Sequence, residues 1–358
     1  MRLKKQKKAA VVGLDIEAGS IAATEVEVNG TIKLAASAIE PLQPGVFHEG
    51  EVLDADGLAD ALKSLFAEHK LSKRVRLGVG NQRVVVRMLR LPVIEDPKEM
   101  AAAVHFQAQE QIPMPLDQAV LEHQVVGGVA AEEGSTPQVD VVVVAARRDM
   151  VESFIKPIRR AGLEPVGIDL SAFGMIRALT GVGVAGDGLG QDGPPASAAL
   201  YCNVGDITNL AVARGSACLF TRVSHVGLEA ISARLSASRG LEPEHAAQWL
   251  THVGLEQPLE AIEGDPETIA EARMALEGGV ASLVDELRLS LDYYGAQEGA
   301  VPVDRIVLCG QGSAIPGLSD WMEGLGLPIV VSRPAALESM DEASAARLTL
   351  PYGLALES

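Results

Sequence analysis

The pattern of hydrophobic and polar positions along the chain predicts a mixed α/β protein. Apolar and polar residues alternate over Ala9 to Val28, with one small polar turn between, and again over Thr31 to Ile39. Such alternation is typical of half-buried strands, so we expect a hairpin followed by a third strand. From Asp56 to His69 the period becomes that of a helix, and one face carries the apolar residues Leu58, Leu62, Leu65 and Phe66.

The two patterns continue to alternate through the first half. Pro97 begins a predicted helix that ends at Gln111, and Gly162 follows a predicted helix over Asp149 to Ala161. A short strand from Gly167 to Leu170 should precede a helix that ends near Leu179. Further strands are predicted at Arg74 to Val79, Arg83 to Leu91, Leu121 to Val126 and Val139 to Ala145.

The second half repeats the opening pattern. The glycine-rich stretch Gly181 to Pro195 has no residues for a packed element, and we interpret it as a linker. A strand at Ala198 to Val204, a turn at Gly205 to Thr208 and a strand at Asn209 to Ala213 follow it, and another strand is expected at Ala217 to Val223. A hairpin with a small polar turn near the start of each half is a weak internal repeat. It predicts a duplicated domain with a cleft between the copies.

Composition narrows the classes of partner. The 358 residues carry a net charge of −18, which argues against nucleic acid and anionic lipid as main partners. Hydrophobic residues make up 47% and aromatic residues 3%, so a large aliphatic core is expected. Lys4, Lys5, Lys7 and Lys8 form a basic N-terminus. We interpret it as a solvated tail, with contact to a membrane surface as the alternative.

The cysteines and the hydropathy pattern predict a cytoplasmic protein. Cys202, Cys218 and Cys309 show no C-x-x-C spacing, so buried free thiols in a reducing compartment are expected. The chain has no run of eighteen apolar residues, and its basic start runs into a strand pattern rather than a signal-peptide core.

The turn after the first strand carries candidate chemistry. Asp15 ends the strand, and Ala18, Gly19 and Ser20 lie in the turn. Backbone N–H groups of such a turn can contact phosphate, and an aspartate at the strand end can face hydrated Mg²⁺. An isolated aspartate at this place would more often be a turn or cap residue.

Several segments along the chain are individually weak signals but are informative in their order and spacing. These are Gly13 to Ser20, Asn81 to Pro92, Ala103 to Asp117, Ala161 to Asp169, Glu286 to Tyr294 and Cys309 to Leu318. Together they cover nearly the whole chain and resemble the PilM family, the actin-like proteins of type IV pilus assembly, which are related to the cell-division protein FtsA.

The resemblance implies an actin-like (ribonuclease H-like, duplicated) α/β fold of two domains, with an inserted subdomain of the FtsA/PilM type. The implied first domain comprises subdomain 1A at residues 1–72 and 148–185 and the inserted subdomain 1C at 73–147. A linker at 186–196 leads to the second domain. That domain comprises subdomain 2A at residues 197–227 and 280–358 and subdomain 2B at 228–279.

The resemblance also implies a site for ATP and Mg²⁺, with Asp15 at the metal. The implied nucleotide-binding residues are Asp15, Ala18, Gly19, Ser20, Asn203, Gly205, Thr208, Gly227, Glu286, Ser290, Gly310, Gln311 and Gly312. Three departures weaken the site: Glu17 replaces a glycine, Ala22 replaces a lysine, and Asn203 replaces an aspartate. Loss of the lysine removes a charge-assisted contact of about 1.5–3 kcal/mol. Nucleotide binding therefore stays open, and little hydrolysis is expected.

The implied partner is the N-terminal tail of a PilN-like inner-membrane protein, which would hold this chain at the membrane from the cytoplasm. In the family an extended peptide lies between the first subdomain and the inserted one. The residues expected to line that groove are Val85, Arg87, Gln111, Ile112 and Pro113. Other pilus assembly proteins are further expected partners, and homo-oligomers are a further option.

Two alternative functions stay open at this stage. One is a working ATPase of the same fold that uses nucleotide as a switch. The other is a small-molecule kinase of the actin-like superfamily, although we find no clear catalytic aspartate after a substrate loop. The sequence also leaves open whether the apparatus is a pilus or a related secretion system.

Overall fold

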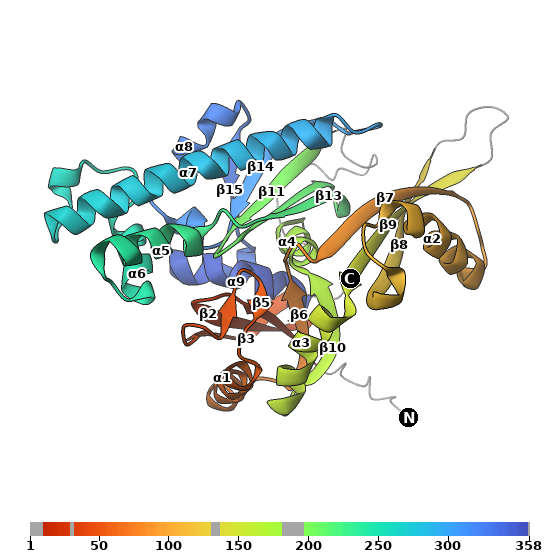
Figure 1. Ribbon diagram of the computed structural model, residues 1–358, viewed down its shortest axis with the longest axis horizontal. Helices are drawn as coiled ribbons and strands as arrows, with labels where there is room; N and C mark the ends of the chain where they lie inside the picture. The colour runs from red at the N-terminus through yellow and green to blue at the C-terminus, as the bar shows by residue number, and fades with distance from the viewer. Residues whose placement is uncertain (1–9, 29–31, 130–136, 181–196, 357–358) are drawn as a thin grey trace, which may run out of the picture.

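A computed structural model describes residues 10–28, 32–129, 137–180 and 197–356. The basic N-terminus and the linker predicted from Gly181 to Pro195 lie outside these residues. Two five-stranded sheets and a smaller three-stranded sheet make up the framework (Figure 1). Among the described residues, no helix is both long enough and apolar enough to cross a membrane.

The first large sheet has the strand order β10-β6-β1-β2-β3. β1 to β3 are antiparallel neighbours, and β6 and β10 add in parallel. The bounds are β1 Val12–Ile16, β2 Ser20–Val28, β3 Ile32–Pro41, β6 Arg74–Val79 and β10 Glu164–Leu170. One face packs on α1 (Ala55–Glu68) and α3 (Arg148–Arg160), which bury Leu62 and Phe154 against it.

The second large sheet repeats this topology with the order β13-β12-β11-β14-β15. Its strands are β11 Ala198–Val204, β12 Thr208–Arg214, β13 Ala217–Ser224, β14 Val303–Cys309 and β15 Ile329–Val331. The helices α5 (Leu228–Arg239), α6 (Pro243–Val253) and α7 (Pro266–Gly295) share one core with it, and α8 (Leu318–Trp321) lies nearby. The repeat seen in the hairpins is therefore a repeat of the whole sheet.

Two helices lie between the large sheets. α4 (Ser171–Thr180) and α9 (Glu342–Ala355) share a core with residues of both sheets, including Ala22 and Tyr201. Gly174 and Gly353 allow their backbones to touch, since a Cβ at Gly353 would overlap the carbonyl of Gly174. α9 belongs to the end of the chain yet packs on β1 and β2, which brings its side chains to the first hairpin.

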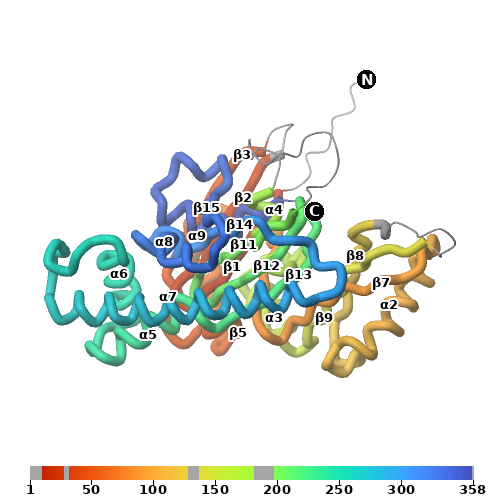
Figure 2. Tube along the Cα trace, turned by 90° about the horizontal axis from the view of Figure 1, so that it is seen from above, coloured from red at the N-terminus to blue at the C-terminus, as the bar shows by residue number. Residues whose placement is uncertain are grey.

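The inserted segment forms a module of its own that projects from the first domain (Figures 1 and 2). Its sheet has the order β7-β9-β8, and one helix covers it. The elements are β7 Val84–Pro92, α2 Pro97–Gln111, β8 Ala119–Val129 and β9 Gln138–Arg147. β8 is longer than the alternation predicted, because β9 pairs with it along its length despite a register shift between Val125 and Gly127.

Short elements complete the chain. A two-stranded ribbon lies before α1, and single turns of 3₁₀-helix join the larger elements. These are β4 Phe47–His48, β5 Glu51–Val52, η1 Leu116–Gln118, η2 Leu259–Ala261, η3 Gln311–Ala314, η4 Glu323–Leu325 and η5 Ala335–Leu337.

Candidate functional site

The tips of the two hairpins face each other across the cleft between the domains. The first turn is closed by a hydrogen bond from Glu17 N to Ser20 O of 2.9 Å, and the second by one from Gly205 N to Ile207 O of 3.3 Å. The Gly19 N–H donates to Asp206 Oδ2 across the cleft at 3.2 Å. The two predicted phosphate loops therefore contact each other directly.

Arg347 of α9 fills the region where the sequence predicts the metal. Its side chain is 4% exposed, and Nη1 donates to Asp15 Oδ2 at 2.5 Å. The same guanidinium donates to Ser20 Oγ at 2.9 Å and to Ser20 O at 3.0 Å. Because a guanidinium carries several N–H donors, Arg347 can pair with the Asp15 carboxylate and donate to Ser20 of the hairpin at the same time. The Asp15 carboxylate is thus an ion-pair partner of an arginine.

Glu17 occupies the space between the two loops. Its Oε2 lies 3.3 Å from Arg347 Nε and accepts a hydrogen bond of 2.5 Å from Gln311 Nε2. Its Oε1 lies so close to Gly205 that a Cβ there would clash with it. Burial raises the pKa of Glu17 to about 8, against the opposing effect of Arg347. Burial therefore favours the protonated form of this carboxyl at neutral pH.

Asp206 shares this environment. Burial raises its pKa, and the negative charge of Glu229 raises it further, while hydrogen bonds from backbone N–H groups oppose the shift. Glu229 also accepts a hydrogen bond of 2.6 Å from His48 Nδ1, which ties α5 to the ribbon of the first domain. Carboxyl groups and one arginine thus hold the cleft closed.

The cavity left at the loops is too small for a triphosphate. Its volume is about 30 Å³, near that of one water molecule, whereas small-molecule sites usually span about 300–1,000 Å³. Carboxyl groups dominate its polar lining, which includes Asp15, Glu17, Glu49, Asp206 and Glu229. Mg²⁺ needs octahedral oxygen ligands and retains several waters. In this arrangement the residues present do not fit Mg²⁺ and ATP phosphates.

The loop predicted to contact adenosine packs on the second hairpin. Gly310 has φ of 80°, a left-handed conformation that favours glycine, and a Cβ there would clash with Asn203 Oδ1. Gly312 packs in the same way against Val204. The sequence argument required the Gln311 side chain to point away from the site. Instead it donates to Glu17, and this contact joins the two domains.

The structure does not bring every predicted nucleotide residue to this place. Glu286 Oε2 pairs with Arg222 Nη2 at 2.9 Å on β13, which is separated from β14 by two strands. Ser290 donates to the carbonyl of Glu286 within its own helix at 2.7 Å. Glu286 and Ser290 therefore do not border the loop of Gly310 to Gly312. The Thr208 hydroxyl is also occupied within the protein, because it donates to Val226 O at 2.6 Å.

Ala22 explains why Arg347 can sit here. It is the cross-strand partner of Asp15 and is fully buried against the helices between the sheets. A lysine at this position would bring a second cation to the same carboxylate. Arg347 supplies from α9 the positive charge that Ala22 lacks.

The residues predicted to bind a peptide divide into two groups. Val85 and Arg87 line a groove of about 130 Å³ with residues of β13, among them Thr221 and Arg222. Ile112 is only 5% exposed and belongs to the core of the inserted module. Gln111 and Pro113 are exposed at the end of α2. The lining of the groove does not include Gln111, Ile112 or Pro113.

Comparison with known proteins identifies the family. The family described as type IV pilus assembly protein PilM matches residues 13–352. This chain belongs to the PilM family.

Solved structures agree with the family assignment. A chain of a PilM–PilN type IV pilus biogenesis complex is 25% identical, with a TM-score of 0.75 over 98% of this chain and 98% of that chain. The ethanolamine utilization protein EutJ from Carboxydothermus hydrogenoformans is 14% identical, with a TM-score of 0.54 over 96% of this chain and 88% of its own.

MreB 5 of Spiroplasma citri bound to AMPPNP is 13% identical, with a TM-score of 0.53 over 97% and 95% of the two chains. EutJ and MreB 5 show the fold alone. Together with the repeated sheet, these likenesses confirm the predicted actin-like fold class of this PilM-family chain.

Arg347 is the residue that the sequence argument missed. It stands alone among apolar residues in Ala345-Ala346-Arg347-Leu348. A single cation in such a helix needs an acid partner if the helix is buried, and this was the available signal. Asp15 lies 332 positions earlier, so nothing local in the sequence indicates the pair.

Proposed function

We propose that this chain is an adaptor of type IV pilus assembly that binds the N-terminal tail of a PilN-like inner-membrane protein. It would work in the cytoplasm and be held at the membrane by that partner. Membership of the PilM family supports this proposal, as does the likeness along 98% of the chain to a chain of a PilM–PilN complex. The same membership favours an adaptor over a small-molecule kinase.

The groove between β7 and β13 is the observation that carries the proposed binding site. β7 is an edge strand of the module and β13 is an edge strand of the second large sheet. Free strand edges offer backbone donors and acceptors to an extended peptide, while pockets take alternate side chains. Val85 and Arg87 would line the path of the tail. The net charge of −18 would also favour a basic segment leaving the membrane surface.

We further infer that the nucleotide site is degenerate and that the adaptor binds its tail without ATP or Mg²⁺. The Arg347–Asp15 ion pair and the Glu17–Gln311 hydrogen bond support this inference, because they use the groups that would face metal and phosphate. A nucleotide-switching ATPase is the second candidate. The fold shared with an AMPPNP-bound MreB 5 favours it, and it would require these contacts to open.

Capture of a synthetic tail peptide by the full chain tests the adaptor. We expect Arg87→Glu and Val85→Asp to weaken capture by at least about tenfold, because both side chains line the groove. Arg90→Glu is the matched control, since Arg90 lies on the same strand but pairs with Asp140 at 3.1 Å. Ile112→Asp is unsuitable, because Ile112 lies in the core of the module. Equal capture by native protein and both groove variants would contradict the proposed site.

A further inference from the structure

A second, larger cavity lies on the β13 side of the cleft, away from the loop of Gly310 to Gly312. Its volume is about 410 Å³, within the range usual for small-molecule sites. Glu49 and Gln82 contribute a wall from the first domain. The other walls come from the end of β13, the start of α5 and the middle of α7, so a ligand here would touch both domains.

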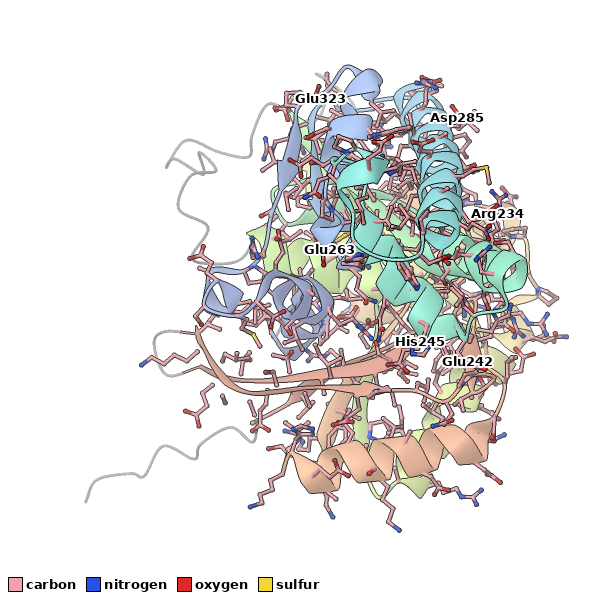
Figure 3. All side chains as sticks on the ribbon, turned by 90° about the vertical axis from the view of Figure 1, so that its left-hand side faces the viewer. Arg234, Glu242, His245, Glu263, Asp285 and Glu323 are labelled. Atoms are coloured by element: carbon pink, nitrogen blue, oxygen red, sulfur yellow. The ribbon has the colours of Figure 1, made fainter. Side chains whose placement is uncertain are left out.

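Basic groups from two elements, β13 and α5, converge on this cavity, although the chain as a whole is strongly acidic. Arg222 belongs to β13. Arg234 belongs to α5, which lies beside α7 (Figure 3). Arg222 is paired with Glu286, but Arg234 forms no ion pair within the described part of the chain. One guanidinium is therefore available to a ligand without breaking an existing contact.

His225 adds a buried polar atom with unused bonding capacity. Its Nδ1 has no hydrogen-bond partner among residues 10–28, 32–129, 137–180 and 197–356 and lies 3.6 Å from Glu49 Oε2, while the imidazole as a whole is 39% exposed. Buried polar atoms without partners are uncommon in native proteins, and a bound molecule is one usual explanation. Ser282 of α7 also lines the cavity and is exposed, and its hydroxyl donates to Gly278 O at 2.9 Å.

The start of α5 opens on the same space. Gly227 and Ala230 line the cavity, and the helix that follows has 12 residues. The first turn of a helix favours negative charge, but the N–H groups of Leu228 and Glu229 already donate to Gly205 O and Asp206 O of the second hairpin. The basic side chains of the cavity, two arginines and His225, still outnumber its two acidic side chains, Glu49 and Glu286.

We propose that this cavity binds a small organic anion, of the phosphate ester class, through Arg234 and His225 with Arg222 and Ser282 as neighbours. Arginine forks match the geometry of phosphate oxygens, and a ligand wedged between Gln82 and α5 would stiffen the contact between the domains. This cavity adjoins the two sites already described: Glu49 also lines the cavity at the hairpins, and Gln82, Arg222 and Val223 also line the groove.

Calorimetric titration of the full chain with pyrophosphate, at ionic strength matched with sodium chloride, tests this site. Saturable binding is expected, and Arg234→Ala should weaken it by at least about tenfold through loss of a charge-assisted contact. Ser282→Asp should weaken it as well, because it adds a like charge at an exposed position. Arg288→Ala is the control, since Arg288 lies on α7 outside the cavity and pairs with Asp285.

The outcomes are distinct from those of the adaptor test. Arg234 and Ser282 do not line the tail groove, so both variants should capture the tail peptide as the native chain does. If pyrophosphate shows no saturable binding at concentrations up to about 10 mM, the proposal is overturned. Equal affinities for native protein and Arg234→Ala would also overturn it.

Discussion

Arg347 on α9 donates to Asp15 at the end of β1 over 2.5 Å, and both side chains are nearly excluded from water. The pair joins the end of the chain to its first hairpin. In an actin-like fold this aspartate is expected to face a metal, whereas here it neutralises an arginine. Burying two charges is favourable only when each is well paired, so the pair should make the hairpin depend on α9.

Arg347→Met should destabilise the protein by about 3–5 kcal/mol, because it leaves the Asp15 carboxylate buried without a partner. The free energy of unfolding in urea measures this loss. Arg288→Met is the control at an exposed ion pair and should change stability by less than about 1 kcal/mol.

The double variant Asp15→Asn with Arg347→Met gives a sharper result. It removes both charges, so it should be more stable than Arg347→Met alone. Additive losses from the two substitutions would mean that the pair contributes no coupling energy.

Glu17 should make stability fall as pH rises. Its pKa is about 8 in the folded chain against an ordinary 4.5. Between these values the folded state keeps a proton that the unfolded chain has lost, so the free energy of unfolding falls with pH and levels off above about 8. Glu17→Gln cannot titrate, and its stability relative to the native chain should rise by about 2–4 kcal/mol from about pH 5 to about pH 9.

The control for this series is Glu110→Gln, at an exposed position on α2. It should follow the native pH profile. Parallel profiles for the native chain and Glu17→Gln would show that Glu17 is ionised in the folded protein.

His48 should also make the free energy of unfolding fall as pH rises, but by less than Glu17 does. Its hydrogen bond to Glu229 raises its pKa, so its contribution is complete below the ordinary value of 6.5 and is lost as pH rises through the folded value. Because its side chain is 55% exposed, His48→Gln should cost less than about 1 kcal/mol at about pH 5.5 and nothing at about pH 9. Thermal unfolding at the two pH values measures the difference. A loss of equal size at both would exclude a protonation effect.

The sequence predicted those helices and strands whose signals lie within a few neighbouring residues. Alternation predicted β1, β2, β6 and β11, and the proline and glycine signals located α2 and the end of α3. The placement of Ile112 was wrong, because α2 turns this residue into the core of its module rather than toward the groove. The Glu17–Gln311 contact spans 294 positions, and contacts of that kind leave no periodic signal.

Restoring the nucleotide site should need three substitutions. Glu17→Gly removes the carboxyl between the loops, Ala22→Lys supplies a cation on the hairpin, and Arg347→Ala frees Asp15. We expect calorimetry to show Mg²⁺-dependent ATP binding by the triple variant and none by the native chain at micromolar concentrations. Glu17→Gly with Ala22→Lys alone should bind poorly, because Lys and Arg347 would compete for one carboxylate. Submicromolar ATP affinity of the native chain would contradict the degenerate site.

The most direct measurement is the affinity of the full chain for the N-terminal tail peptide of its PilN-like partner, with and without saturating Mg²⁺ and ATP. The account predicts saturable binding with the same Kd in both conditions, because Arg347 and Glu17 already close the cleft next to the groove. Tail binding that appears only with nucleotide, or that is absent in both conditions, would contradict an adaptor that works without ATP.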